Sequence, residues 1–288
     1  MTKLWTIGTL LQWTQQYFAQ KGIDSPRLDA EILLSHVLHK ERIYLYAHYD
    51  EPMNPTELAA YRDMVKQRAS RLSVAHILGM KSFMGLEFHV STNVLIPRPE
   101  TELLVENVVA MIEKNKPVSI LDMGTGSGAI LISLLHYLPQ AVGTGVDISS
   151  DALQIARKNS QNLQVDTRVQ WIESDLFSAL SHETFDWVVS NPPYLTASDM
   201  QHLQPEVQYD PALALFGGTD GLDIYRRLAK ESPTYIKQDG YMAVEIGAGQ
   251  ASDVIAIFTQ DGWYTHVKTV KDYSGIERVI VFSRKERM

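Results

Sequence analysis

Over residues 1–72, apolar side chains recur at steps of three and four, which is the period of an amphipathic helix. Trp13 and Tyr17 share one such helical face. Ser25-Pro26 and Asn54-Pro55 have the residue types of an N-cap followed by the first helical position, so each predicts the start of another helix. With a short helix expected between these two, this part of the chain is predicted to be a small all-α domain. It is either a stabilising appendage or a substrate-recognition module.

Residues 73–99 differ in composition from the helical part. Aromatic residues flank Met84-Gly85, a pattern typical of a short β-hairpin, and we expect this segment to link two domains. The prolines of Ile96-Pro97-Arg98-Pro99 exclude a helix until Glu100, and the acidic residues that follow favour the first turn of one. We therefore place the second domain at residues 100–288.

In the second domain, the pattern changes to short apolar runs that alternate with helical stretches. Strands are predicted at residues 118–123, 141–148, 169–173, 185–190 and 240–246, helices at 129–138, 222–237 and 250–258, and a terminal hairpin at 264–282. Such alternation predicts an α/β domain with a largely parallel sheet, and ligands of these sheets bind at the carboxyl ends of the strands.

The strand at residues 185–190 ends in Asn191-Pro192-Pro193-Tyr194, whose prolines cannot donate to a sheet ladder. The Asn191 side-chain oxygen and the Pro192 carbonyl can accept the two N–H protons of a planar amide or aromatic amine, and the Tyr194 ring can lie against the flat group. A rigid turn that only ends the strand is the alternative interpretation.

A glycine loop, Gly124-Thr125-Gly126-Ser127-Gly128, follows the strand at residues 118–123. Asp147 stands 21 residues after Gly126, the interval at which an acid on the next strand meets the ribose of a nucleoside held by the loop. The loop lacks both the closing glycine of a dinucleotide site and the Lys-Ser/Thr of a phosphate loop. S-adenosylmethionine, a nucleoside without phosphates, fits this pattern, although such a loop can also be only a tight turn.

The third strand of the domain ends in Ser174-Asp175-Leu176-Phe177. In this topology that position is the adenine edge, where Asp175 can accept a proton of the exocyclic amine and Leu176 can cover the ring. The cofactor loop and the Asn191 turn are thus predicted to lie at neighbouring strand ends.

Composition removes several kinds of chemistry. The chain of 288 residues has no cysteine, which excludes disulfides, thiolate metal sites, thiol nucleophiles and cysteine-held iron–sulfur clusters. The close pair His36 and His39 lacks a third ligand nearby, so we predict no metal site. The densest apolar run, Ala129 to Leu135, is too short to cross a bilayer, and we expect a cytoplasmic protein with no membrane partner.

Charge is unevenly distributed along the chain. The net charge is −8, and residues 91–288 carry 16 Lys and Arg against 25 Asp and Glu. Proteins that grip nucleic acid neutralise phosphates with a basic surface, so this distribution argues against DNA or RNA as a direct partner.

Together these residues resemble the release factor glutamine methyltransferases of the HemK/PrmC type. The likeness spans nearly the whole chain and rests on motifs in addition to the helical N-terminal domain. These are Ala75 to Gly79, Phe83 to Phe88, Leu95 to Glu102, Asp122 to Gly128, Asp147, Asn191 to Tyr194, Tyr209-Asp210-Pro211 and Gly217 to Tyr225. The last two lie in a loop-rich segment that we expect to cover the crevice as a substrate lid.

The resemblance implies a seven-stranded class I (Rossmann-like) S-adenosylmethionine-dependent methyltransferase domain with a reversed last hairpin, preceded by a helical bundle that contacts the substrate. It implies methylation of the side-chain amide nitrogen of the glutamine in the Gly-Gly-Gln motif of class 1 peptide chain release factors. By this resemblance, Gly124 to Gly128, Asp147 and Asn191 bind the cofactor, and Asn191 to Tyr194 hold the glutamine. Leu176 departs from the aromatic residue that some members carry.

We expect the amide nitrogen to attack the methyl group directly, with no covalent enzyme intermediate. Two other functions are compatible with parts of the sequence. A DNA or RNA amino-methyltransferase acting on adenine or guanine would use the same Asn-Pro-Pro-Tyr turn. A non-catalytic binding protein would use only the helical domain.

Overall fold

The computed structural model describes residues 5–181 and 183–285, which form two compact units. The first unit contains the described residues up to Met80 together with Gln204–Tyr209, and the second contains the remainder. The segment predicted to be a linker, residues 73–99, is therefore divided between the two units.

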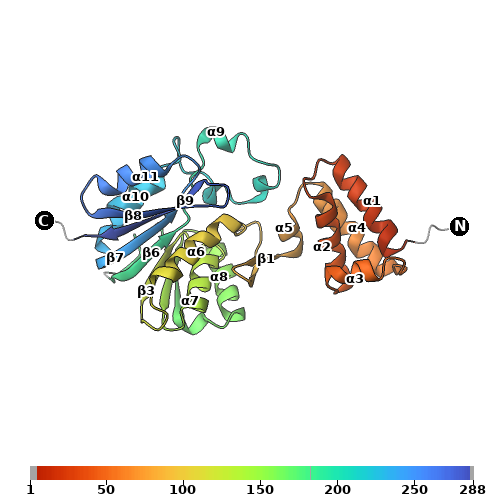
Figure 1. Ribbon diagram of the computed structural model, residues 1–288, viewed down its shortest axis with the longest axis horizontal. Coiled ribbons are helices and arrows are strands. Elements are labelled where there is room, and N and C mark those ends of the chain that lie inside the picture. The colour runs from red at the N-terminus through yellow and green to blue at the C-terminus, as the bar shows by residue number, and fades with distance from the viewer. Residues whose placement is uncertain (1–4, 182, 286–288) are drawn as a thin grey trace. The chain divides into compact units, whose positions relative to one another are not determined.

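The first unit is helical (Figure 1). Its helices are α1 (Ile7–Gln20), α2 (Pro26–Leu38), α3 (Arg42–Ala47), α4 (Pro55–Ala69) and α5 (Val74–Leu78). The four helices predicted in this region are confirmed, and Asn54 closes a capping box with Glu57 at the start of α4. Phe18, Leu33 and Tyr61 are fully buried in the core between α1, α2 and α4.

A short piece of the predicted lid, Gln204–Tyr209, also belongs to this first unit. The Glu206 carboxylate accepts hydrogen bonds of 3.0 Å from the guanidinium groups of Arg68 and Arg71 on and just after α4. Arg68 is buried and also pairs with Asp29 of α2 at 2.7 Å. A largely buried cluster of two cations and two carboxylates therefore holds this segment against the helices.

The second unit begins with a two-stranded hairpin and continues as a seven-stranded sheet with helices on both faces (Figure 1). The hairpin strands are β1 (Met80–Phe83) and β2 (Leu86–His89). The sheet strands are β3 (Ser119–Met123), β4 (Val142–Asp147), β5 (Val169–Glu173), β6 (Phe185–Ser190), β7 (Ile236–Glu245), β8 (Tyr264–Lys271) and β9 (Glu277–Arg284). The helices are α6 (Pro99–Met111), α7 (Ala129–Tyr137), α8 (Ser150–Asn162), α9 (Ala197–Met200), α10 (Asp223–Glu231) and α11 (Ala251–Thr259).

The strand order is β5-β4-β3-β6-β7-β9-β8. Strands β3 to β7 pair in parallel, whereas β9 lies antiparallel to both β7 and β8. The predicted α/β class and the seven-stranded sheet with a reversed terminal hairpin are confirmed, as is the hairpin before α6.

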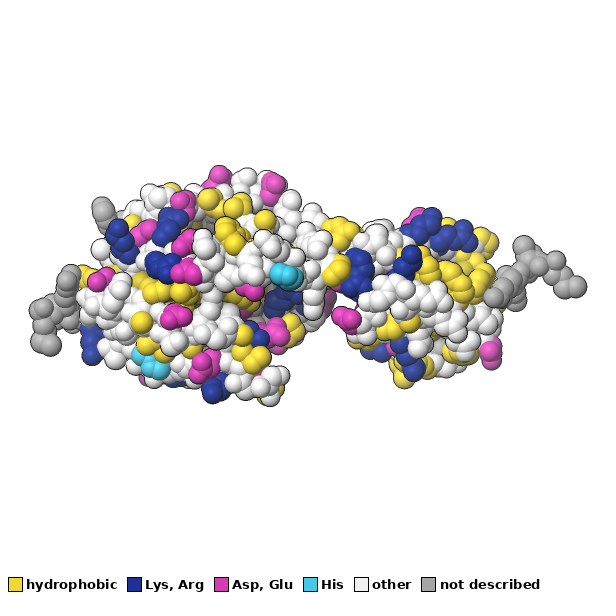
Figure 2. Space-filling model, turned by 90° about the horizontal axis from the view of Figure 1, so that it is seen from above, with side chains coloured by type: hydrophobic (Ala, Val, Ile, Leu, Met, Phe, Trp, Pro, Cys, Tyr) yellow, Lys and Arg dark blue, Asp and Glu magenta, His cyan; other side chains and the backbone are white. Residues whose placement is uncertain are grey.

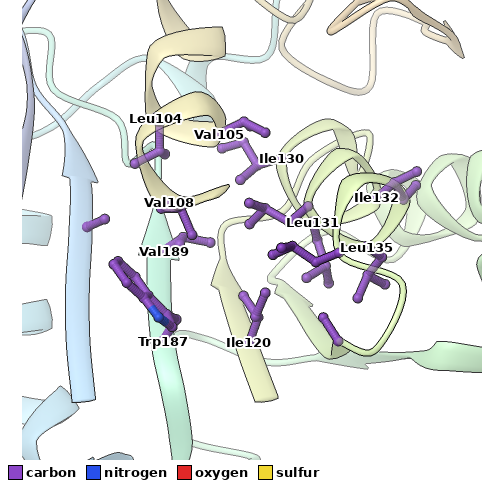
Figure 3. Packing of buried hydrophobic residues seen from close by; sticks show 14 of the residues in the cluster. Leu104, Val105, Val108, Ile120, Ile130, Leu131, Ile132, Leu135, Trp187 and Val189 are labelled. Atoms are coloured by element: carbon purple, nitrogen blue, oxygen red, sulfur yellow. The ribbon is translucent and has the colours of Figure 1, made fainter. Parts of the chain in front are cut away.

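Alternate residues of the strands enter two separate cores, one on each face of the sheet. Ile120 packs under α6 and α7, where Leu104 and Leu131 are fully buried (Figure 3). The next residue, Leu121, faces the opposite core, in which Tyr225 of α10 is fully buried. This two-residue period is what a sheet covered on both faces requires, and it fixes the register of the strands that carry the site.

Several elements differ from the sequence prediction: α5 and α9 were not predicted, and α6 begins at Pro99 rather than Glu100, because proline is accepted at the first helical position. Helix α8 was not predicted, because its buried face consists mainly of small or polar residues rather than large apolar ones. The helix predicted at residues 222–237 ends at Glu231, since Ser232-Pro233 turns the chain, and β7 then starts at Ile236 through a polar stretch.

Candidate functional site

A cavity of about 390 Å³ opens at the carboxyl ends of β3, β4, β5 and β6 in the second unit. Ligand pockets of this size and position are usual for open α/β sheets. Its lining includes eight of the predicted site residues: Gly124, Gly126, Asp147, Asp175, Leu176, Asn191, Pro192 and Pro193. The glycine loop and the turn after β6 follow directly paired strand ends, since Met123 of β3 is opposite Ser190 of β6.

The glycine loop leaves room at the cavity. Gly124 and Gly126 have φ of +74° and +54°, and a Cβ atom built on either would meet nothing within 4 Å. A side chain there would be strained and would extend into open space beside the loop. Gly128 has a different role, because a Cβ would lie 2.7 Å from Ile132 where α7 begins. Thr125, Ser127 and Gly128 shape the loop and are not among the lining residues.

The Asp147 carboxylate is fixed at the end of β4. Its two oxygens accept backbone N–H bonds from Gly126 at 2.8 Å and from Ser149 at 2.9 Å. Burial raises the pKa of Asp147, and these backbone donors oppose that shift. The carboxylate keeps further lone pairs that can accept hydroxyl protons from the cavity side.

A second carboxylate lies beneath the loop. Asp122 is fully buried at the end of β3 and accepts a hydrogen bond of 2.6 Å from the Thr125 hydroxyl. Burial raises the pKa of Asp122 to about 7, the Thr125 hydrogen bond lowers it, and the nearby Asp147 charge raises it further. Asp122 therefore supports the loop from below and does not line the cavity.

Asp175 and Leu176 line the cavity after β5. The Asp175 carboxylate is about half exposed and pairs with Arg227 of α10 at 2.8 Å. Leu176 has φ of +49°, an unusual conformation for a branched residue, which places its side chain at the cavity wall. Arg227 also lines the cavity and was not predicted as a site residue.

The Asn191 side chain is oriented by α6. Its Nδ2 donates a hydrogen bond of 3.1 Å to the Thr101 hydroxyl oxygen in the first turn of that helix. Pro192 is buried, and the turn is held from outside by Gln250, whose Nε2 donates to the Tyr194 carbonyl at 3.1 Å. A Cβ atom at Gly217 would approach the Pro193 carbonyl to 2.6 Å, so only glycine permits the chain at this position to pack so closely on the turn.

Tyr194, unlike Asn191, Pro192 and Pro193, does not line the cavity. Its ring packs against the core on the α10 and α11 face. Burial raises the pKa of its hydroxyl to about 12, and the charge of Glu245 adds to this shift. A role for the ring against the substrate stays a prediction.

Two residues close to Asn191 were missed by sequence interpretation, Thr101 and Glu245. Both are buried, at 4% and 2% exposure. Burial raises the pKa of Glu245, at the end of β7, to about 7, and the polar side chains of Thr101 and Asn191 nearby oppose this shift. An acid directly after the apolar run Tyr241 to Val244 was a visible signal in the sequence.

The segment before α6 contacts the loop-rich segment that was predicted to be a substrate lid. Arg98 donates a hydrogen bond of 2.8 Å to Asp210, whose side chain is almost fully buried. Burial raises the pKa of Asp210 to about 6, and the Arg98 charge opposes this. Pro211, Leu213 and Phe216, which follow Asp210, line the cavity.

Neither a metal-binding cluster nor a membrane-spanning helix occurs among the described residues. Among residues 5–181 and 183–285, no group of three or more His, Asp or Glu side chains could hold a metal ion. No described helix is both long and apolar enough to cross a bilayer. Figure 2 shows acidic and basic side chains intermixed on the face of the second unit that it displays.

Comparison with known sequences finds two family models. Residues 9–79 match the PrmC N-terminal domain, and residues 99–206 match the methyltransferase small domain. The chain is 42% identical over 279 residues to the release factor glutamine methyltransferase of Geobacter sulfurreducens, covering 96% of each chain. It is 39% identical over 282 residues to the protein of the same name from Rhodopirellula baltica, covering 96% of this chain and 95% of that one.

Among solved structures, a methyltransferase from Pyrococcus furiosus aligns with a TM-score of 0.55. The alignment covers 77% of this chain and 99% of that chain at 16% identity. At this identity, the likeness shows a shared methyltransferase fold and no more.

Proposed function

Because the chain belongs to the release factor glutamine methyltransferase family, we propose that it transfers a methyl group from S-adenosylmethionine to the side-chain amide nitrogen of a glutamine in a release factor. The glutamine is that of the Gly-Gly-Gln motif in class 1 factors, and the reaction modulates translation termination in the cytoplasm. The enzyme is a methyltransferase in fold and family.

One observation carries this proposal. A single cavity is lined both by the glycine loop with Asp147 and by Asn191 with Pro192. A nucleoside-type donor and a planar amide can therefore meet in one space. Rate enhancement in such a transfer comes chiefly from holding the two reactants in a reactive orientation.

The residues present fit S-adenosylmethionine. The open space beside Gly124 and Gly126 would admit its amino-acid part, and the fixed Asp147 carboxylate would accept its ribose hydroxyls. Asp175 and Leu176 would contact the adenine. When bound, this donor supplies an electrophilic methyl group on a positively charged sulfur.

The turn after β6 would hold the glutamine. Since Asn191 Nδ2 is engaged by Thr101, its side-chain oxygen is the atom left to accept an amide proton, and the Pro192 carbonyl can accept the other. The amide nitrogen is then fixed with its lone pair toward the donor. An amide nitrogen is a weak nucleophile, because its lone pair is delocalised, so this orientation matters more here than for an amine.

The helical unit would supply recognition of the release factor. It matches a domain model found with this family and carries exposed aromatic residues, including Trp13. Trp5, Trp13 and Tyr17 line a cavity of about 390 Å³ on this unit. We assign it to binding of the protein substrate and the second unit to catalysis.

The test is methyl transfer from labelled S-adenosylmethionine to a purified class 1 release factor, with DNA and RNA oligonucleotides assayed alongside. Label should enter the release factor only. Label in the oligonucleotides instead would contradict the proposal and favour an amino-methyltransferase of nucleic acid that uses the same turn.

A further inference from the structure

Behind the substrate turn, Asn191 after β6 donates a hydrogen bond to Thr101 of α6, and Glu245 lies next to this pair because the preceding Val244 of β7 is opposite Ser190 of β6. Glu245 is 2% exposed and is not among the cavity-lining residues. Its Oε2 has no hydrogen-bond partner among the described residues. The fold alone gives no reason to bury a carboxylate here, since an apolar residue would fill the same place at less cost.

We propose that Glu245 is a positioning residue that, together with Thr101, fixes the Asn191 amide with its nitrogen toward the protein and its oxygen toward the cavity. This inference rests on the proposed function for its meaning in catalysis. The orientation itself is a property of the enzyme alone.

The argument follows from which groups can donate. A hydroxyl both donates and accepts, so Thr101 by itself could bind either end of the Asn191 amide. An ionised carboxylate only accepts. With Glu245 ionised, the Thr101 hydroxyl can donate its proton only toward an acceptor such as that carboxylate, and its oxygen accepts from Asn191 Nδ2 at 3.1 Å.

Protonation of Glu245 removes this constraint. A neutral carboxyl group can donate to Thr101, which can then donate to the Asn191 oxygen and turn the amide over. The cavity would then receive an N–H group where the substrate amide needs an acceptor. Loss of orientation is therefore expected as pH falls through the pKa of Glu245, which burial raises to about 7.

The charged and titratable groups around Glu245 come from several elements. Arg278 on β9 lowers its pKa, and Glu100 on α6 raises it. Burial raises the pKa values of Tyr194 and Tyr225, and the charge of Glu245 raises them further, so both hydroxyls stay protonated near neutral pH. Arg278 is itself paired with Asp272 at 2.9 Å, so its charge is shared.

Kinetics with matched variants test the catalytic part. For Glu245→Gln and Thr101→Val, we expect kcat for the release factor to fall by about tenfold with little change in KM for S-adenosylmethionine. Thr101→Ser keeps the hydroxyl and should restore most of the activity. Glu100→Gln removes a neighbouring charge without touching Asn191, and its kcat at pH 8 should stay within about twofold of wild type.

The side-chain amide signals of Asn191 test the orientation without any substrate. In the wild-type enzyme labelled with ¹⁵N-asparagine, the signals that vanish in Asn191→Asp should shift with a midpoint at about pH 7. In Glu245→Gln they should not titrate. The inference would be overturned if the wild-type signals did not shift with pH. It would also be overturned if kcat were unchanged in both Glu245→Gln and Thr101→Val.

The two experiments separate the inference from the function on which it rests. If the wild-type enzyme methylates no release factor but the Asn191 signals titrate as expected, the proposed function fails and the orientation by Glu245 stands. If the release factor is methylated and the signals do not titrate, only the inference fails. The titration is made on the wild-type enzyme, and Asn191→Asp serves only to identify the signals.

Discussion

The carboxylate of Asp147 accepts a hydrogen bond of 2.8 Å from the backbone N–H of Gly126. The end of β4 is thereby tied to the loop that follows β3, and the acid and the open side of the loop are held as one surface. Because both line the cavity, a change at either residue should act first on cofactor binding.

Asp147→Asn keeps the size of the side chain but replaces one acceptor oxygen by a donor nitrogen and removes the charge. We expect the dissociation constant of S-adenosylmethionine, measured by calorimetry, to rise by about tenfold or more through loss of acceptors for the ribose hydroxyls. An unchanged dissociation constant would remove the ribose role of Asp147.

Gly126→Ala tests the space beside the loop. Its φ of +54° disfavours any Cβ, and the methyl group would enter the open region. We expect a loss of about 1 kcal/mol in the free energy of unfolding together with weaker S-adenosylmethionine binding. Gly275→Ala is the matched control, because Gly275 has φ of +82° and equally open surroundings in the β8–β9 turn. That variant should show a similar stability loss and normal binding.

Asn191→Ala removes the acceptor that would orient the glutamine amide. We expect kcat for the release factor to fall by about a hundredfold or more, whereas the affinity for S-adenosylmethionine changes far less. Single-turnover methylation and calorimetry on the same preparation measure the two effects. Full activity of this variant would refute the role of the turn.

Asp122 predicts a pH dependence of stability. Its pKa is about 7 in the folded protein, against 3.8 as its ordinary value. The folded state therefore holds the proton more tightly, so this contribution is present below about pH 4 and is lost as pH rises through 7. The loss is on the order of 4 kcal/mol.

Asp122→Asn cannot titrate and serves as the comparison. Its free energy of unfolding relative to wild type should increase as pH is raised from 5 to 8, measured by urea denaturation. Parallel pH profiles of the two proteins would show that the buried carboxyl group does not hold its proton as described.

Much of this architecture could be predicted because local residue types decide it. Apolar runs and a two-residue period set the strands, and a period of three to four residues sets the helices. Pro192 and Pro193 end β6 whatever surrounds them. Helix α8 was missed, since the signal of Ala152 and Ala156 on its buried face is weak in sequence.

The parts that could not be predicted depend on contacts between distant residues. Glu245 meets Asn191 only because β7 pairs with β6, and Thr101 joins them only because α6 packs over that strand end. The assignment of Gln204–Tyr209 to the helical unit likewise depends on Glu206 meeting Arg68, 138 positions away. Neither pairing leaves a periodic pattern in the sequence.

The most direct measurement is to locate the transferred methyl group by mass spectrometry on a class 1 release factor incubated with the enzyme and S-adenosylmethionine. The account predicts one added methyl on the side-chain amide of the Gly-Gly-Gln glutamine and none on a factor altered to Gly-Gly-Ala. A methyl group at another residue, or equal labelling of the altered factor, would contradict it.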